Sequence, residues 1–296
     1  MAAVTGSSPA AQAGTITLGG DLTVNRMGYG AMRITGPGIW GPPADRAGAV
    51  ATLRRAVELG VNFIDTADTY GPDVSEELIA EALHPYPAGL VIASKAGWTR
   101  PGPMLWAHNA SPAHLEKALE GTLRRLRLER IEVFQLHVPD PAVSFDASME
   151  TLARLREQGK IRHVGLSNVT LEHVERARKI VPIVSVQNRY SFSDREWDYL
   201  VDHCEAHGIA FLPWGPMAQG KKANEVVEKI AADRGVSTAV VSLAWLLRRS
   251  RVILPIPGTA SIPHLEENVG AAAFRLSDAE FAELKAVKPK PFWLRG

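Results

Sequence analysis

The sequence predicts a (β/α)8 barrel that forms one domain. Eight short, mostly apolar runs alternate with helical patterns along 296 residues, with no break in composition between them. Such runs are typical of parallel strands that helices cover on both faces. A doubly wound open sheet is the alternative, but it would open a helix with Gly-x-Gly-x-x-Gly. Here Gly28-Tyr29-Gly30 is followed by Met32 and Arg33, and a helix begins only later.

Composition argues against several classes of protein. The formal charge of +1 gives no general attraction to nucleic acid or acidic membranes, and no apolar run approaches the ~20 residues of a membrane span. The single cysteine, Cys204, excludes an intramolecular disulfide and suits a reducing cytoplasm, where we expect the protein to act. Residues 1–14 are rich in Ala, Gly, Ser and Pro and predict a disordered tail, so that the barrel domain spans residues 15–296.

The strands are predicted in order along the chain. Gly19-Gly20-Asp21 separates two short strand patterns between Thr15 and Val24, which predicts a hairpin ahead of the barrel. The predicted barrel strands span residues 26–32, 61–64, 90–94, 131–136, 162–166, 183–187, 209–214 and 252–256. A loop is expected at residues 36–43, and a long loop rich in Trp, Pro and Gly at residues 96–110.

The helices have capping signals and apolar stripes. Asp45 caps the first helix and Gly60 ends it, and the second carries Leu78, Ile79 and Leu83. Ser111 followed by Pro112 starts the third, because Ser suits the cap and Pro the first turn. The remaining predicted helices span residues 145–158, 170–180, 196–207, 223–234, 237–249, 262–271 and 278–287.

Polar residues stand at or just past the ends of three successive strands. The strand at residues 61–64 leads into Asp65, and Tyr70 lies on the loop beyond it. The next two strands end in Lys95 and His137. A buried carboxylate is costly unless it is paired, so Asp65 needs a partner. Because the active site of such a barrel lies at the carboxyl ends of its strands, we expect these four side chains to meet there.

The four side chains suit the reduction of a carbonyl group. A tyrosine hydroxyl has a pKa near ~10, and a lysine ammonium beside it favours the phenolate and lowers that pKa. Asp65 would fix Lys95 and keep it charged, and His137 would orient a carbonyl or relay a proton. Because none of them is a good covalent nucleophile, the hydride would come from a cofactor. Taken alone, Asp65 and Lys95 could also be a structural ion pair.

The sequence strongly resembles the aldo-keto reductase superfamily from roughly Thr15 to Val287, and it is most like bacterial NADP-dependent members. The matching stretches read NFIDTADTYG, VIASKAG, FQLHVPD, GKIRHVGLSN, VQNRYS, ILPIPGT and HLEEN. The resemblance implies a (β/α)8 barrel with a hairpin below it, and NAD(P)H-dependent reduction of aldehydes and ketones. It also implies that Tyr70 is the proton donor, that Lys95 and Asp65 activate it, and that His137 orients the carbonyl.

The resemblance also implies where a cofactor binds. Ser167, Asn168 and Gln187 would hold the nicotinamide carboxamide, and Trp214 would stack on the ring where the family usually has Tyr. The other implied cofactor-binding residues are Gly30, Met32, Gly215, Pro216, Met217, Gly258, Thr259, Ser261, His264, Glu267 and Asn268.

NADPH is the expected cofactor, with NADH as the alternative. The chain after the eighth strand starts a helix near Ser261, and a helix start offers free N–H groups and a positive dipole end to the 2′-phosphate. Many relatives carry Lys at the position of Gly258 and Arg at that of His264, so two permanent charges are missing here. We therefore expect a reduced preference for NADPH that weakens as pH rises and His264 loses its proton.

Aromatic residues on the loops after the first and third strands predict an apolar substrate pocket. Trp40, Trp98 and Trp106 would line it, and Arg33 and Arg100 are candidate anchors for a polar substituent. The alternative is that Trp106 and Arg100 only pack the long loop. Such a pocket predicts better activity on aromatic or heteroaromatic aldehydes than on short aldoses.

Other functions stay open. Some relatives, such as potassium-channel β subunits, keep the cofactor site and serve mainly as cofactor-sensing binding partners, while some similar bacterial reductases have a narrow role such as pyridoxal reduction. The intact set of four residues favours an enzyme that acts on a small-molecule carbonyl compound. His203 and His207 have the spacing of metal ligands, but their helix precedes strand seven and so lies away from the active end, and no metal is expected. The physiological substrate and the oligomeric state are not predictable from these signals.

Overall fold

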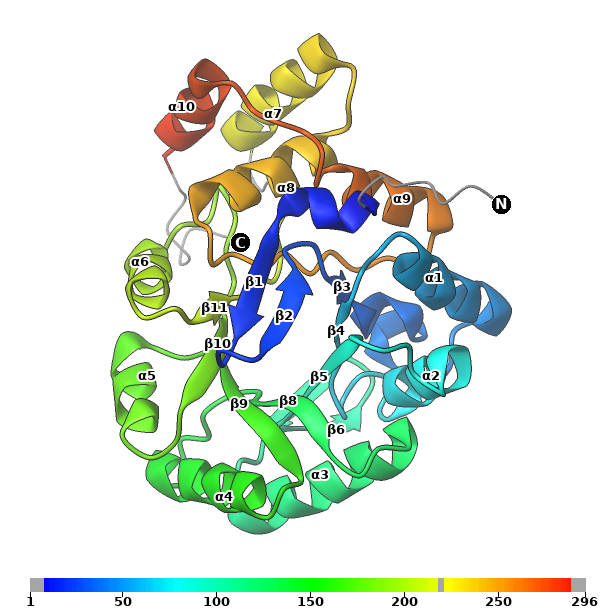
Figure 1. Cartoon of the computed structure of the whole chain (residues 1–296), viewed down its shortest axis with the longest axis vertical. Coiled ribbons are helices and arrows are strands. Elements are labelled where there is room, and N and C mark those ends of the chain that lie inside the picture. Colours follow the sequence, from blue (N-terminus) through cyan, green and yellow to red (C-terminus); the bar gives the residue numbers. More distant parts are fainter. Residues whose placement is uncertain (1–7, 218–220, 289–296) are drawn as a thin grey trace.

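The computed structural model describes residues 8–217 and 221–288, and its parallel strands form a barrel inside a ring of helices (Figure 1). The strands are β1 (Thr15–Leu18), β2 (Leu22–Asn25), β3 (Tyr29–Gly30), β4 (Phe63–Asp65), β5 (Val91–Ala96), β6 (Trp98–Gly102), β7 (Leu105–His108), β8 (Ile131–Leu136), β9 (Ile161–Ser167), β10 (Ile183–Gln187) and β11 (Ala210–Phe211). Seven of them make one parallel sheet in the order β11, β10, β9, β8, β5, β4, β3. Because each neighbouring pair in this sheet is parallel, the carboxyl ends of all seven strands lie at one end of the barrel.

Residues 252–257 close the barrel between β11 and β3. On one side, the N–H and C=O of Phe211 both bond to this segment, and on the other the N–H groups of Gly28 and Gly30 donate to the carbonyls of its two prolines. Because proline has no N–H, Pro255 and Pro257 cannot donate to β3, and on the other side the segment makes only an isolated bridge to β11, between Ile253 and Phe211. The sequence predicts a regular eighth strand here. The prediction of a closed (β/α)8 barrel is confirmed.

Backbone packs directly against backbone beside this closing segment. A Cβ added at Gly258 would lie 2.5 Å from the carbonyl oxygen of Gly30, and one added at Gly30 would lie 2.6 Å from that of Ile256. Real Cβ atoms do not come so close to a backbone oxygen, so both positions require glycine for the close approach.

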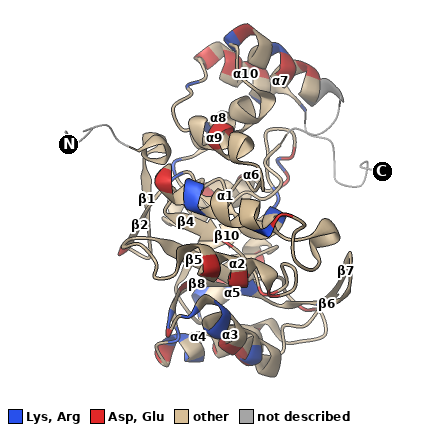
Figure 2. Cartoon of the chain, turned by 90° about the vertical axis from the view of Figure 1, so that its right-hand side faces the viewer, with Lys and Arg blue, Asp and Glu red and all other residues tan. Residues whose placement is uncertain are grey.

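Helices surround the barrel (Figure 1), and Figure 2 shows positions of charged residues along them. They are η1 (Pro9–Ala13), η2 (Ala31–Ile34), η3 (Pro37–Ile39), α1 (Arg46–Glu58), α2 (Val74–Leu83), α3 (Pro112–Leu126), α4 (Phe145–Glu157), α5 (Leu171–Arg178), α6 (Asp198–Ala206), α7 (Lys221–Arg234), α8 (Thr238–Arg249), α9 (Ile262–Gly270) and α10 (Asp278–Ala286). The predicted caps are found, because the side chains of Asp45, Ser111 and Thr170 each accept a hydrogen bond from the first turn of their helices.

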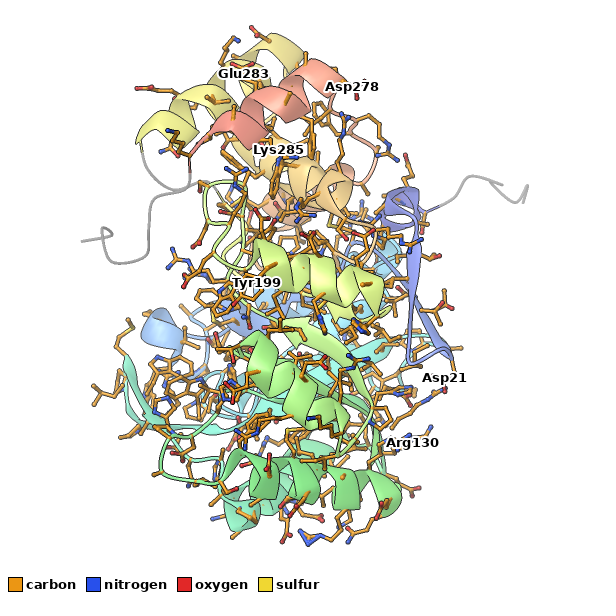
Figure 3. All side chains as sticks on the ribbon, turned by 90° about the vertical axis from the view of Figure 1, so that its left-hand side faces the viewer. Asp21, Arg130, Tyr199, Asp278, Glu283 and Lys285 are labelled. Atoms are coloured by element: carbon orange, nitrogen blue, oxygen red, sulfur yellow. The ribbon has the colours of Figure 1, made fainter. Side chains whose placement is uncertain are left out.

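The β1–β2 hairpin covers the amino-terminal end of the barrel and lies across the centre of Figure 1. Leu18, Leu22 and Val24 are buried in one cluster with apolar side chains from the barrel strands. At the turn of the hairpin, Asp21 bonds to His163 of β9 (Figure 3). This end of the barrel is therefore filled with apolar side chains, which leaves the opposite end for chemistry.

Two expectations from the sequence are wrong. The predicted disordered tail includes Pro9–Ala13, which form the 3-10 helix η1 with Ala10 fully buried; residues 1–7 lie outside the described part of the chain. The predicted long loop at residues 96–110 contains the antiparallel hairpin β6–β7, which protrudes from one side of the barrel (Figure 2). Pro101, Gly102 and Pro103 hide the strand signal there, since both residue types are depleted in strands.

Neither a membrane span nor a metal site is found within residues 8–217 and 221–288. No single helix there is long and apolar enough to cross a membrane, and α7 with α8 meets that test only as a pair bent by 102°. No group of three or more His, Cys, Asp and Glu side chains in these residues could hold a metal ion.

Candidate active site

The ammonium group of Lys95 connects two other residues of the predicted site, Asp65 and Tyr70. Its Nζ atom donates to Asp65 Oδ1 at 2.7 Å, to the Thr66 carbonyl at 2.7 Å and to the Tyr70 hydroxyl at 3.2 Å. Asp65 and Lys95 are buried because they end the neighbouring strands β4 and β5 inside the barrel. Tyr70 reaches them from the loop that leads into α2. The predicted meeting of these side chains is therefore found.

Two buried amides hold the other oxygen of Asp65. Gln135 Nε2 donates to Asp65 Oδ2 at 3.1 Å, and Gln187 Nε2 donates to the same atom at 2.8 Å. Gln135 is not predicted from the sequence as a site residue, although it lies in the stretch FQLHVPD and alternation along β8 points it to the same side as His137, two residues on. Both oxygens of the Asp65 carboxylate thus accept hydrogen bonds, which is what a buried charge requires.

Burial and charge together keep Tyr70 protonated and Lys95 charged. The sequence predicts that the Lys95 charge lowers the pKa of Tyr70. It does, but burial raises this pKa by more, so that the pKa lies above its ordinary value. Burial by itself would lower the pKa of Lys95, but Asp65 and Tyr70 raise it above its ordinary value. The site therefore holds a neutral phenol beside an ammonium ion, so that a proton is available on Tyr70 at neutral pH.

His137 is a neutral imidazole at the end of β8. Burial, and then the charge of Lys95, holds the pKa of His137 well below its usual range. Its ring lies edge-on to that of Tyr70, with 5.9 Å between the ring centroids. The Nδ1 atom is buried without a hydrogen-bond partner among the described residues, and the side chain lines a cavity together with Tyr70. His137 can therefore offer a ring N–H to a ligand without being a charged acid.

The cavity at the carboxyl end of the barrel has a volume of about 600 Å³. Besides Asp65, Tyr70 and His137, the predicted residues that line it are Gly30, Met32, Arg33, Trp98, Trp106, Ser167, Asn168, Gln187, Trp214, Gly215, Pro216, Met217 and Gly258. A neighbouring cavity of about 490 Å³ shares Met217 and Gly258 with it. The predicted residues that line this second cavity are Thr259, His264, Glu267 and Asn268. Except for Ser261, which lines neither cavity, the predicted cofactor residues thus follow one continuous path from the catalytic residues to α9.

The residues along this path fit an elongated dinucleotide. At the α9 end, Asn268 is only 6% exposed and lines the cavity. Ser261 precedes the helix and its side chain makes no capping bond, although Thr259 Oγ1 accepts from the Ser261 N–H at 3.0 Å. At the other end, the indole N–H of Trp214 donates to Asn168 Oδ1 at 3.2 Å, which fixes the ring at the cavity edge. An amide that lines the cavity and an open helix start are groups that an adenine and a phosphate can use.

Two of the five predicted substrate-pocket residues do not line the cavity. Trp40 and Arg100 lie behind its wall, with the Arg100 guanidinium carbon 5.5 Å from the centroid of the Trp40 ring. Arg100 donates to backbone carbonyls and stacks on Trp106, so it is not an anchor for a substituent of the substrate. Packing within the long loop, the alternative role predicted for Arg100, therefore explains these contacts better than a role in binding the substrate.

Comparisons with known proteins agree with this geometry. The sequence pattern of the Aldo/keto reductase family matches residues 26–289. The chain is 47% identical over 277 residues to an uncharacterized oxidoreductase of Schizosaccharomyces pombe, covering 93% of this chain and 90% of that protein. It is 44% identical over 280 residues to pyridoxine 4-dehydrogenase of Escherichia coli, covering 92% and 98%. A structure of an aldo-keto reductase from Klebsiella pneumoniae in complex with NADPH superposes with a TM-score of 0.78 at 26% identity, covering 94% of this chain and 96% of that one. The chain therefore belongs to the aldo/keto reductase family.

Proposed function

We propose that this NAD(P)H-dependent oxidoreductase reduces aldehydes and ketones to alcohols with Tyr70 as the proton donor. One observation carries the assignment of the donor: the buried Lys95 ammonium donates hydrogen bonds both to Asp65 and to the Tyr70 hydroxyl. A lysine held in that position stabilises the phenolate that remains after Tyr70 has given up its proton. Tyr70 and His137 both line the cavity, which supports a role for each at the carbonyl oxygen.

The residues of the site act on the carbonyl oxygen. When bound, the reduced nicotinamide supplies a hydride for the carbonyl carbon. Tyr70 donates its proton to the oxygen, and Lys95 stabilises the phenolate through the hydrogen bond that it already makes. Because His137 is neutral, it donates a hydrogen bond to the same oxygen and does not compete with Tyr70 as an acid. Asp65 holds Lys95 in place for this step.

The cofactor is proposed to lie along the two joined cavities. Ser167, Asn168 and Gln187 would bind the carboxamide, since Gln187 uses only its Nε2 atom on Asp65 and keeps Oε1 for a ligand. Trp214 would stack on the nicotinamide ring. At the other end, the 2′-phosphate would meet Thr259, Ser261 and His264 at the start of α9, and the adenine would meet Glu267 and Asn268. Gly30, Met32, Gly215, Pro216, Met217 and Gly258 would line the path between the two ends.

The first prediction concerns cofactor preference. We expect higher catalytic efficiency with NADPH than with NADH, because Thr259, Ser261 and His264 at the start of α9 can donate hydrogen bonds to a 2′-phosphate. The measurement is the ratio of kcat/KM for the two cofactors, with His264→Ala expected to have a smaller ratio than the unmodified enzyme. His207→Ala, which changes an exposed histidine at the end of α6, is the matched control. A ratio that favours NADH would contradict the NADPH assignment, and an unchanged ratio in His264→Ala would remove His264 from the phosphate site.

Aromatic and heteroaromatic aldehydes are the proposed substrates. The rings of Trp98 and Trp106 lie edge to face with centroids 6.0 Å apart, and Trp106 lies edge-on to His137 at 6.4 Å. Arg33 lines the same cavity, is exposed, and makes no hydrogen bond or ion pair to any described residue, so it can bind a polar substituent. Pyridoxal is the favoured narrow candidate, because one relative is named pyridoxine 4-dehydrogenase and a pyridine aldehyde belongs to this class.

The second prediction tests this substrate class. We expect kcat/KM for benzaldehyde and pyridoxal to exceed that for glyceraldehyde by about 10-fold or more, a typical return for filling an apolar pocket. The measurement is a panel of carbonyl compounds assayed with NADPH and with NADH. Equal efficiencies for aromatic and short hydroxylated aldehydes would count against the pocket. Slow turnover of every compound, combined with tight cofactor binding, would instead favour a cofactor-sensing partner protein.

We also propose that the enzyme works in the cytoplasm on small molecules and has no nucleic-acid partner. The single cysteine supports this location, since Cys204 is free and buried in α6 and needs no oxidising compartment. The formal charge of +1 supports the absence of a polyanionic partner.

A further inference from the structure

The guanidinium group of Arg100 joins three separate segments of the chain. Its Nε atom donates to the Leu105 carbonyl at 3.0 Å, which ties β6 to β7. Its Nη2 atom donates to the Gly38 carbonyl at 3.0 Å, and Nη1 donates to the Ile39 carbonyl at 2.9 Å. Nη1 also donates to the Thr69 carbonyl at 3.2 Å. One side chain thus fixes the protruding hairpin against η3 and against the loop that carries Tyr70.

The same guanidinium supports the aromatic wall of the cavity. Its central carbon lies 4.0 Å from the centroid of the Trp106 ring, a close cation–π contact. Trp106 lines the cavity and lies edge-on to His137, whereas Arg100 stands behind the wall. The position of the Trp106 ring relative to the catalytic residues therefore depends on where Arg100 holds it.

The bond to Thr69 ties the aromatic wall to the loop of the proton donor. The carbonyl group of Thr69 and the nitrogen of Tyr70 belong to one peptide unit, so Arg100 fixes Trp106 relative to this loop, while the Tyr70 hydroxyl is held separately by its hydrogen bond from Lys95. Lysine cannot make all of these contacts. Its ammonium is not planar, so it cannot stack on the Trp106 ring, and its three donors extend from one point and do not reach carbonyls of separate segments. A positive charge alone is not what this position requires.

We propose that Arg100 is a positioning residue that sets the preference for aromatic substrates, by holding Trp106 at a fixed place relative to Tyr70 and His137. This inference rests on the proposed carbonyl reductase activity. Loss of the guanidinium fork leaves the ammonium–carboxylate pair of the site untouched, because Arg100 makes no contact with Asp65 or Lys95. Chemistry on a small carbonyl compound should therefore survive, while the binding of a ring against the wall should weaken.

The test compares benzaldehyde with propanal in Arg100→Lys. We expect KM for benzaldehyde to rise about 5- to 10-fold, with kcat nearly unchanged. A loss of this size corresponds to the cation–π contact and the guanidinium hydrogen bonds that the substitution removes. We expect kcat/KM for propanal and the dissociation constant of NADPH, measured by calorimetry, to stay as in the unmodified enzyme. The matched control is Arg275→Lys, because Arg275 also donates to carbonyls of two segments, at Ala272 and Gln12, but does not line either cavity of the site.

A double-mutant cycle separates positioning through Trp106 from a general loss of structure. Trp106→Leu should reproduce the rise in KM for benzaldehyde, and adding Arg100→Lys to it should change KM no further, since coupled residues are not additive. Equal losses for benzaldehyde and propanal, additive effects in the double variant, or unchanged KM in Arg100→Lys would each overturn the inference. An unmodified enzyme that reduces neither compound would instead refute the proposed function itself.

Discussion

Phenylalanine in place of Tyr70 is expected to lower the turnover of carbonyl reduction by about 10²- to 10⁴-fold, the usual contribution of a general acid. The change removes a single oxygen from a side chain that is only 7% exposed, so the ring keeps its packing. Lys95 loses one acceptor but keeps Asp65 and the Thr66 carbonyl, so the charge pair stays in place. Single-turnover kinetics with NADPH measures the chemical step, and calorimetry measures cofactor affinity, which should not change.

The control for Tyr70→Phe is Tyr86→Phe. Tyr86 also donates its hydroxyl to a protein oxygen, the Leu126 carbonyl at 2.7 Å, but it does not line the cavity. Turnover in this control should equal that of the unmodified enzyme. Retention of more than about a tenth of turnover in Tyr70→Phe would rule out Tyr70 as the general acid.

Methionine in place of Lys95 is expected to abolish turnover and also to destabilise the fold. Lys95 is fully buried, and it is the ion-pair partner that the structure gives to the buried Asp65. Removing one member of a buried pair costs about 3–5 kcal/mol, because the other charge stays in a medium that solvates it poorly. Gln135 and Gln187 would still donate to Asp65, so the loss should lie toward the lower end of that range. Urea denaturation measures the change in unfolding free energy.

An exposed lysine provides the comparison for Lys95→Met. Lys160 pairs with Glu120 on the surface, with 37% and 48% of the two side chains exposed. Lys160→Met should change the unfolding free energy by less than about 1 kcal/mol and leave turnover unchanged. If Lys95→Met were as stable as Lys160→Met, or if it kept measurable turnover, the pair of Lys95 and Asp65 would have neither the structural nor the catalytic importance proposed here.

The part of the site that lies on strands is predictable from the sequence. Asp65 and Lys95 stand at the ends of adjacent parallel strands, and the period of a strand then requires their side chains to enter the same end of the barrel. The helix caps at Asp45, Ser111 and Thr170 follow equally from local chemistry, since each side chain bonds within its own first turn. Such features depend on neighbours in sequence or on a regular repeat.

Features that depend on contacts between distant segments are not predictable in this way. Gln135 lies in the matching stretch FQLHVPD, but it carries no charge, and only the fold brings its amide to Asp65, 70 residues away in sequence. Arg100 is interpreted as a substrate anchor because a basic residue near tryptophans suits that role, yet its carbonyl partners come from loops whose paths no local signal reveals. The β6–β7 hairpin is missed because Pro101 and Gly102 interrupt the strand pattern of β6 and Pro103 follows them in the turn.

The contact between Gly30 and Gly258 limits how cofactor selectivity can evolve in this chain. Any side chain at position 258, including the lysine that the family resemblance leads one to expect there, would place its Cβ 2.5 Å from the Gly30 carbonyl oxygen. Gly30 also bonds to the segment that closes the barrel, and both glycines line the path proposed for the cofactor. A permanent charge at position 258 therefore also requires a change in β3. Two substitutions are needed, and the first of them is unfavourable without the second. Ser261 and His264, at the open start of α9, are free of this constraint and offer the single-step route to a stronger discrimination between the two nicotinamide cofactors.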